Sequence, residues 1–163
     1  MNVFLSYAVG QFDAPVAARL RAVAAAYDIS ILLPDRTQAV TNGLAADTLK
    51  KIRQSDAVIA LVTQTSHGSL KNVVNLELQA TAQAGKPIIA LVEQGIQVQG
   101  APASQVVYFD RLNPTAHEPQ LVNALEQIRQ QQQQRKNDLT ALGWIAGIAL
   151  GLVALSELFN DKK

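Results

Sequence analysis

The stretch SDAVIALVTQTSHGSLKNVVNLELQATAQAGKPIIALV, residues 55–92, decides the fold of this chain. Two nearly all-apolar runs, residues 57–63 and 87–92, enclose a segment over residues 73–84 that contains no glycine or proline and stops at Gly85. Apolar runs without alternation are typical of strands buried on both faces, and the segment between them has the length of a helix. Strand, helix and strand at this spacing predict two parallel strands joined by a crossover helix.

The same alternation continues toward both ends of the chain. We expect further strands over residues 3–7, 29–33 and 106–110, and further helices over residues 13–27, 44–55 and 119–136. Asp13 is expected at the N-cap of the first helix, with Pro15 tolerated in its first turn. The pattern predicts an α/β fold of the flavodoxin-like, doubly wound kind, with a parallel five-stranded sheet in the order 2-1-3-4-5. Residues 1–118 form this domain, and residues 119–138 form a closing helix and Gln-rich linker.

Composition excludes several classes of function. The net charge of +1 over 163 residues argues against a broad phosphate-binding surface, so we expect no nucleic-acid partner. The absence of cysteine excludes disulfide scaffolds, zinc ribbons and thiol nucleophiles. The chain has only 2 histidines, His67 and His117, far apart in sequence, so we expect no metal site.

The C-terminal stretch LTALGWIAGIALGLVALS, residues 139–156, contains no charged residue. At about 1.5 Å per residue, a helix over residues 139–159 matches the roughly 30 Å thickness of the bilayer hydrocarbon. We therefore predict a single transmembrane helix there, with residues 160–163 as a short tail; the alternative is a helix buried in an oligomer. Because the N-terminus lacks a basic, apolar signal segment, we expect the domain to face the cytoplasm at the inner membrane.

Three glycines, Gly143, Gly147 and Gly151, recur every four residues in this stretch. Such a ridge lets two membrane helices approach backbone to backbone, so we predict lateral self-association in the lipid bilayer. The alternative is that glycine is simply common in membrane helices.

A ligand site is expected where the strand order reverses, at the carboxyl ends of the first and third strands. The loops over residues 8–12, 34–43 and 64–72 meet there. Glu77 lies just inside the helix that follows the third strand, among apolar or neutral neighbours. Such a carboxylate can act as a nucleophile or stabilise a sugar cation during glycosidic cleavage; the alternative is an ordinary exposed helix glutamate. Asp35 and Glu93 are the nearest candidates for a second carboxylate, and neither is obviously paired with it.

Four segments together resemble the TIR domains, over about residues 1 to 110. They are NVFLSYA at 2–8, LLPDRTQAVTNG at 32–43, IRQSDAVIALVTQTS at 52–66 and NLELQATAQAGKPIIAL at 75–91. Enzymatic TIR domains cleave the nicotinamide–ribose bond of NAD, which would be the substrate here, with no further cofactor. The resemblance implies Glu77 as the catalytic glutamate, and the family often carries Trp where this chain has Val73. The substrate-binding residues that it implies are Tyr7, Ala8, Gly10, Asp35, Arg36, Asn42, Gly43, Ser69 and Val73.

The segment SDAVIALV…LELQATAQAGKPII is also similar to the nucleoside 2-deoxyribosyltransferases, which use a glutamate at this place as the nucleophile on an N-glycosidic bond. Our first hypothesis is a membrane-anchored NAD glycohydrolase or cyclase of bacterial anti-phage immunity, activated by oligomerisation through its TIR domain and its glycine ridge. The alternatives are a deoxyribosyltransferase-like enzyme, a non-catalytic scaffold that binds TIR domains through residues 34–43, and a membrane helix that itself permeabilises the bilayer.

Overall fold

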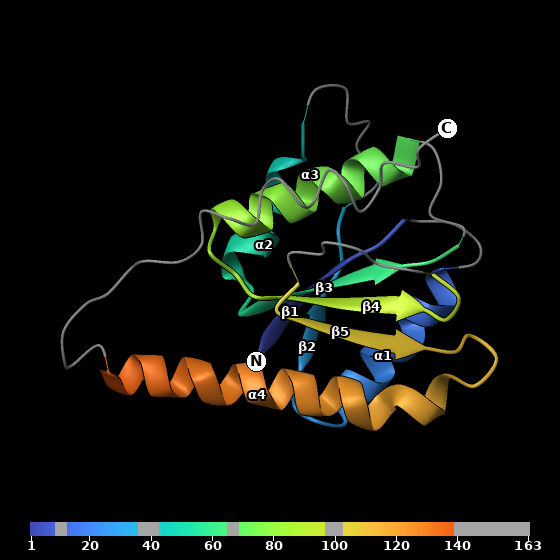
Figure 1. Cartoon of the computed structure of the whole chain (residues 1–163). Helices are drawn as coiled ribbons and strands as arrows, with labels where there is room; N and C mark the ends of the chain where they lie inside the picture. The colour runs from blue at the N-terminus through green and yellow to red at the C-terminus, as the bar shows by residue number, and fades with distance from the viewer. Residues whose placement is uncertain (9–12, 36–42, 65–68, 97–102, 139–163) are drawn as a thin grey trace.

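The computed structural model describes residues 1–8, 13–35, 43–64, 69–96 and 103–138. Its centre is a parallel five-stranded sheet in the order β2-β1-β3-β4-β5 (Figure 1). The strands are β1 Asn2–Ser6, β2 Ser30–Leu32, β3 Ala57–Val62, β4 Ile88–Glu93 and β5 Gln105–Phe109. The predicted fold class and strand order are therefore confirmed.

Helices cover both faces of the sheet. They are α1 Ala14–Ala25, α2 Ala46–Gln54, α3 Ser69–Gln83 and α4 Glu118–Asp138, with a short 3-10 helix, η1 Pro114–His117, before α4. The α1 and α4 helices lie on one face, and α2 and α3 lie on the other (Figure 1). The largest difference from the expected bounds is at α3, which begins at Ser69 instead of residue 73, whereas α4 ends within two residues of the expected end at residue 136.

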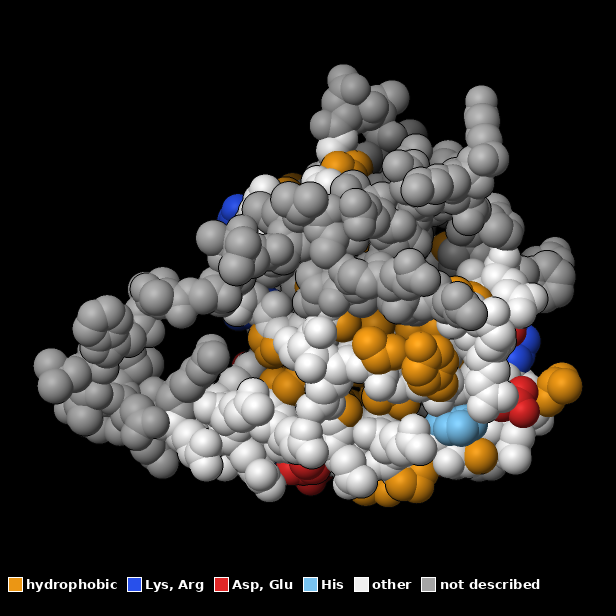
Figure 2. Space-filling model, in the orientation of Figure 1, with side chains coloured by type: hydrophobic (Ala, Val, Ile, Leu, Met, Phe, Trp, Pro, Cys, Tyr) orange, Lys and Arg blue, Asp and Glu red, His pale blue; other side chains and the backbone are white. Residues whose placement is uncertain are grey.

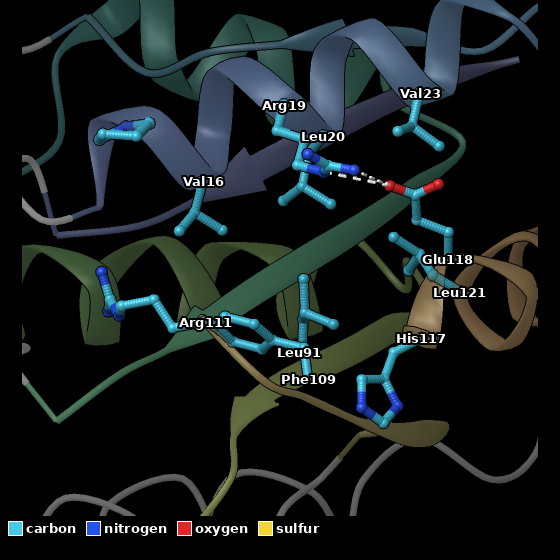
Figure 3. Close-up of a pocket in the computed structure, with 11 residues that line it drawn as sticks. Val16, Arg19, Leu20, Val23, Leu91, Phe109, Arg111, His117, Glu118 and Leu121 are labelled. Atoms are coloured by element: carbon cyan, nitrogen blue, oxygen red, sulfur yellow. Dashed lines mark hydrogen bonds and ion pairs between the residues drawn. The ribbon is translucent and has the colours of Figure 1, made fainter. Parts of the chain in front are cut away.

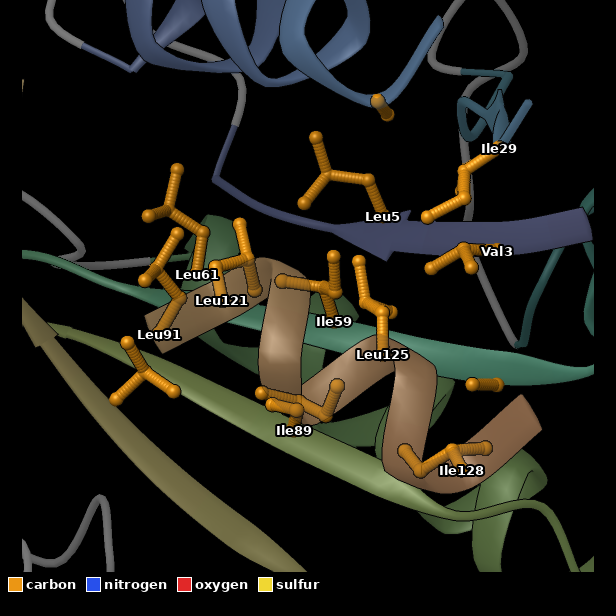
Figure 4. Packing of buried hydrophobic residues seen from close by; sticks show 14 of the residues in the cluster. Val3, Leu5, Ile29, Ile59, Leu61, Ile89, Leu91, Leu121, Leu125 and Ile128 are labelled. Atoms are coloured by element: carbon orange, nitrogen blue, oxygen red, sulfur yellow. The ribbon is translucent and has the colours of Figure 1, made fainter. Parts of the chain in front are cut away.

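Strand alternation divides the core into two layers. The larger layer joins odd-numbered strand residues to α1 and α4, and Figure 4 shows Leu125 and Ile128 of α4 against them. Its strand members include Val3, Leu5, Ile59, Leu61, Ile89, Leu91, Val107 and Phe109. The smaller layer joins even-numbered residues to α2 and α3, and includes Phe4, Val58, Ala60, Ile88, Ile52, Val74 and Leu78. The near-continuous apolar runs of the sequence arise because the central strands are buried on both sides.

The edge strand β5 is covered on one side more than on the other. Val107 and Phe109 are buried against the α1 and α4 layer, whereas Val106 and Tyr108 are 42% and 43% exposed. Figure 2 shows hydrophobic side chains gathered on the face seen above α4. Alternate residues of this strand therefore divide between the core and the surface.

No helix within the described ranges is both long enough and apolar enough to cross a membrane. The predicted transmembrane segment, residues 139–159, lies outside those ranges, as do Gly143, Gly147 and Gly151 of its glycine ridge.

Shortening a buried side chain of α4 tests whether this helix is part of the core. Ile128 is 3% exposed, so we expect Ile128→Val to lower the free energy of unfolding by about 1 kcal/mol through lost burial and a small cavity. Urea unfolding measures the change. Leu112→Ala is the control, because Leu112 is 94% exposed and its truncation should leave the free energy nearly unchanged. Equal stability of Ile128→Val and wild type would contradict the packing.

Candidate active site

Glu77 is fully buried, at 0% exposure, on the α3 helix. The Ser6 hydroxyl at the end of β1 donates a hydrogen bond of 2.6 Å to Glu77 Oε2. Because β1 pairs with both β2 and β3, Ser6 marks the point where the strand order reverses. Glu77 therefore lies beside the strand end where the order of the strands reverses, and the alternative of an ordinary exposed helix glutamate is wrong.

The helix holds Glu77 inward because Val74 and Thr81, about one turn before and after it, and the adjacent Leu78 are also buried. Val74 and Leu78 belong to the smaller core layer, and the Thr81 hydroxyl donates a 2.7 Å hydrogen bond to the Glu77 carbonyl. A carboxylate in such surroundings costs stability unless hydrogen bonds compensate, and an apolar residue would fill this position more cheaply. A buried acid beside a strand end is therefore a candidate for chemistry rather than for stability.

Ser6 and Tyr7, at the end of β1, lie on opposite faces of the sheet. The Tyr7 side chain is 8% exposed and packs in the α1 and α4 layer, on the opposite face of the sheet from Glu77. Ala8 is buried directly after it. Val73 lies one turn before Glu77 on α3 and is half-buried. The structure thus places Ser6, which the sequence analysis did not single out, against Glu77. The Tyr7 ring, which was predicted to bind substrate, lies on the other face of the sheet.

The structure describes three of the remaining predicted substrate-binding residues, Asp35, Gly43 and Ser69. Asp35 is half-buried after β2, and Gly43 has a φ of +148°, a backbone conformation that favours glycine. Ser69 is the first residue of α3. Gly10, Arg36 and Asn42 lie outside the described residues.

A second polar cluster lies at the same edge of the sheet, and the sequence analysis missed it. Arg111, just after β5, donates from Nε to Glu93 Oε1 at 2.8 Å and from a terminal nitrogen to Asp13 Oδ1 at 3.3 Å. The Thr63 hydroxyl donates to Asp13 Oδ2 at 3.2 Å, and the Gln64 backbone N–H donates to Glu93 Oε2 at 3.0 Å. We call these five residues the Arg111 cluster.

The Arg111 cluster determines where the side chains of Asp13 and Glu93 lie, two residues that the sequence analysis named. Asp13 occupies the N-cap position of α1 as predicted, but its side chain makes no capping hydrogen bond and faces Thr63 and Arg111 instead. Glu93 shares the odd-numbered face of β4 with Leu91, opposite to Glu77, so it does not form a carboxylate pair with Glu77. The cluster ties the ends of β3, β4 and β5 to the start of α1.

Ion pairing in this cluster shifts two pKa values. The hydrogen bond from Arg111 is the main reason why the pKa of Glu93 lies below its ordinary value of 4.5; burial opposes this shift, and the Gln64 N–H adds to it. The hydrogen bond to Glu93 raises the pKa of Arg111 above its ordinary, already high value, against the effect of burial. Both groups are therefore held in their charged forms at neutral pH.

The lowered pKa of Glu93 predicts how stability depends on pH. A carboxyl whose pKa is depressed on folding contributes stability above its unfolded pKa and loses it as the pH falls through the folded pKa. We expect Glu93→Gln to be less stable than wild type at pH 7 and the difference to shrink as the pH falls below about 4.5. Urea unfolding of both proteins between pH 7 and pH 3 measures this. A difference that stays constant with pH would contradict the ion pair.

No group of three or more His, Cys, Asp or Glu side chains in the described part of the chain is arranged to hold a metal ion. At the carboxyl edge, the described part of the chain places Ser6 and Glu77 on one face of the sheet and the Arg111 cluster on the other. The first of these fits a reaction at a cationic carbon, because a carboxylate there can stabilise positive charge.

No family model matches the sequence, and no curated protein matches it. Among solved structures, the chain is similar to a 2-deoxyribosyltransferase from the psychrotolerant bacterium Bacillus psychrosaccharolyticus, with a TM-score of 0.53 and 15% identity over 68% of this chain and 86% of that one. It is also similar to CapF, solved with the inhibitor 3-isopropenyl-tropolone, with a TM-score of 0.41 and 16% identity over 68% of this chain and 30% of that one. The first similarity shows a shared α/β fold.

Proposed function

We propose that the chain is an enzyme that acts on the N-glycosidic bond of a nucleoside, with Glu77 as the carboxylate beside the anomeric carbon. The observation that carries the proposal is the buried Glu77 carboxylate, held by Ser6 at the reversal of strand order. Open α/β sheets bind their ligands at this place. An acid retained there, against the cost of its burial, is best explained by a reaction that needs a negative charge.

The reaction would begin with cleavage of the bond between C1′ of the sugar and the base nitrogen. The base leaves with the bonding electrons, while positive charge develops on C1′ and the ring oxygen; a purine takes up a proton from solvent, whereas nicotinamide leaves as a neutral molecule. Glu77 stabilises that charge or forms a transient ester bond to C1′. A second base or a water molecule then attacks C1′, loses a proton to solvent and releases Glu77 as a carboxylate. Ser6 restrains the rotation of the carboxylate through its hydrogen bond to Oε2.

Transfer of a 2-deoxyribosyl group is the first form of the reaction that we propose. The fold similarity to a 2-deoxyribosyltransferase supports it, together with the likeness of residues 55–92 to that family. Glu77 occupies the place in the sequence where those enzymes carry their nucleophile.

Cleavage of the nicotinamide–ribose bond of NAD is the second form. The sequences at 2–8 and 32–43, which resemble the TIR domains, favour it. In that form the apolar stretch 139–159 and its glycine ridge would bring copies together at a membrane, and their assembly would activate the enzyme.

A substrate panel tests the proposal and separates its two forms. The full chain is incubated with 2′-deoxyinosine plus adenine, and separately with NAD, at several protein concentrations. We expect chromatography to show 2′-deoxyadenosine and hypoxanthine in the first reaction; nicotinamide release in the second would favour the other form. Glu77→Gln, prepared in the same way, sets the background. If wild type does not exceed that background with either substrate, the proposal fails.

A further inference from the structure

The edge strand β5 presents two half-exposed apolar side chains on the α2 and α3 side of the sheet. Val106 and Tyr108 are 42% and 43% exposed there, although strands of a parallel sheet are normally buried on both faces. Among the described residues, α2 and α3 make their main strand contacts with β1 and β3. Figure 2 shows hydrophobic side chains at the surface above α4, where β5 runs in Figure 1. We call the side of β5 that carries Val106 and Tyr108 the β5 outer face.

The connection from β4 to β5 is short compared with the other crossovers on this side of the sheet. It comprises residues 94–104, whereas a crossover between parallel strands usually needs about a dozen residues or more and contains a helix. Its described residues, 94–96 and 103–104, form turns and loops. The two preceding crossovers contain α2 and α3. The described part of the fold therefore supplies no crossover helix over the β5 outer face.

The same chain carries an apolar segment that needs a surface of this kind. Residues 139–156 contain no charged side chain, and they follow directly on α4, which ends at Asp138. In water such a segment exposes a large apolar area, and removal of apolar area from water is favourable. A bilayer or an apolar protein surface can provide that removal. The β5 outer face is such a protein surface within the same molecule.

The end of α4 lies within reach of the β5 outer face. Gln105, the first residue of β5, donates a side-chain hydrogen bond to Gln127, so the start of β5 lies beside that point of α4. Residue 138 lies about 17 Å further along the helix, at about 1.5 Å per residue. About six residues in extended form return that distance, which leaves about 12 residues of the segment. As a helix they cover about 18 Å, roughly the length of β5, and the chain can pass around this edge strand.

A cavity between α1 and α4 is the other apolar surface that the segment might be thought to fill (Figure 3). Its lining includes Leu121 in the first turn of α4, about 26 Å from residue 138 at about 1.5 Å per residue. The lining also contains the charged side chains of Arg19, Arg111 and Glu118. The β5 outer face is closer to the end of α4, and its two exposed side chains are uncharged.

We propose that residues 139–156 fold back on their own domain in aqueous solution and cover Val106 and Tyr108 on the β5 outer face. The segment then takes the place of the crossover helix that the described connection from β4 to β5 does not supply. The transmembrane helix expected from the sequence is the competing outcome of the test. The inference does not rest on the proposed function. In the second form of that function, assembly at a membrane would first have to withdraw the segment from β5.

Cross-linking of engineered cysteine pairs tests the proposal in the full chain, which has no cysteine of its own. Tyr108→Cys is combined with Ile148→Cys, near the middle of the segment, and treated with a short bismaleimide in detergent-free buffer. We expect a link within one chain, detected by mass spectrometry as joined peptides in material that migrates as a monomer on a denaturing gel. Tyr27→Cys with Ile148→Cys is the matched control and should give no link above background. Tyr27 is also an exposed tyrosine, at 48%, but it lies just before β2 at the opposite edge of the sheet.

Trp144 provides a second readout, because it is the only tryptophan of the chain and belongs to the segment. We expect Tyr108→Lys to shift the Trp144 fluorescence to longer wavelength, since a charge on the β5 outer face returns the segment to water. Tyr27→Lys should leave the emission unchanged. Circular dichroism checks that both variants fold, as expected for substitutions at half-exposed positions.

Four results would overturn the proposal. They are links that form only between chains, equal link yields from the two cysteine pairs, Trp144 emission that Tyr108→Lys does not change, and recovery of the chain only from the membrane fraction. The last result would assign the segment to the bilayer. None of these measurements depends on turnover of a nucleoside or of NAD, so their failure is distinct from failure of the proposed function.

Discussion

Under the proposed function, Glu77→Gln is expected to lower turnover of the N-glycosidic substrate by about 10³-fold. The amide has nearly the same shape as the carboxylate but carries no negative charge, so it neither stabilises the sugar cation nor bonds to C1′. Because the group acts mainly in the transition state, the loss should appear in kcat, with KM little changed. Steady-state chromatography of base release, over a range of substrate concentrations, measures both constants.

Stability provides the control for this substitution. A buried carboxylate is costly and a buried amide less so, so we expect Glu77→Gln to unfold at the same temperature as wild type or a higher one. Ser6→Ala, which removes the hydrogen bond to Glu77 Oε2, should lower kcat by only about tenfold, because the charge remains. Full activity in Glu77→Gln, or loss of activity that follows loss of folding, would contradict the catalytic role.

Arg111→Leu is expected to lower the free energy of unfolding by about 3 kcal/mol. The substitution leaves Asp13 and Glu93 without their cation, and the side chains of these acids are only 3% and 14% exposed. Breaking a buried pair in this way costs more than the pair itself contributes, because the remaining charges are poorly solvated. Urea unfolding at pH 7 measures the loss.

Arg129→Leu is the matched control for Arg111→Leu. Arg129 pairs with Glu126 on the surface of α4, where the side chains are 45% and 38% exposed, so its removal should change stability by less than about 0.5 kcal/mol. Adding Asp13→Asn and Glu93→Gln to Arg111→Leu should recover part of the loss, because both uncompensated charges are then removed. Similar effects of Arg111→Leu and Arg129→Leu would show that the cluster does not stabilise the fold.

The sheet was predictable because its strands are buried on both faces. Runs such as AVIALV and IIALVE leave no alternating polar pattern, and the spacing between them admits a parallel crossover. The start of α3 was harder to predict, because residues 69–72, SLKN, show no helical apolar period. The N-cap position of Asp13 followed from local sequence, but the direction of its carboxylate did not, since Thr63 and Arg111 lie far along the chain.

The residues of the candidate site differ in how far their positions could be predicted from the sequence. The place of Glu77 could be predicted, because its position after the third strand puts it near the carboxyl edge of the sheet. The face of the sheet on which Tyr7 lies could also have been predicted, since alternation along β1 places it with Val3 and Leu5, away from Ser6. The Arg111 cluster could not be predicted from the sequence, because its members come from four separate segments that only the tertiary fold brings together.

The unbroken course of α4 sets the direction in which the chain leaves the domain. The helix is buried against the sheet as far as Ile128, and Gln132 still donates to the Asp56 carbonyl. Residues 133–138 then carry the chain about 9 Å further at about 1.5 Å per residue. The direction of the chain at residue 138 is therefore set by the packing of α4 against the domain, through a continuous helix that projects beyond its last contact.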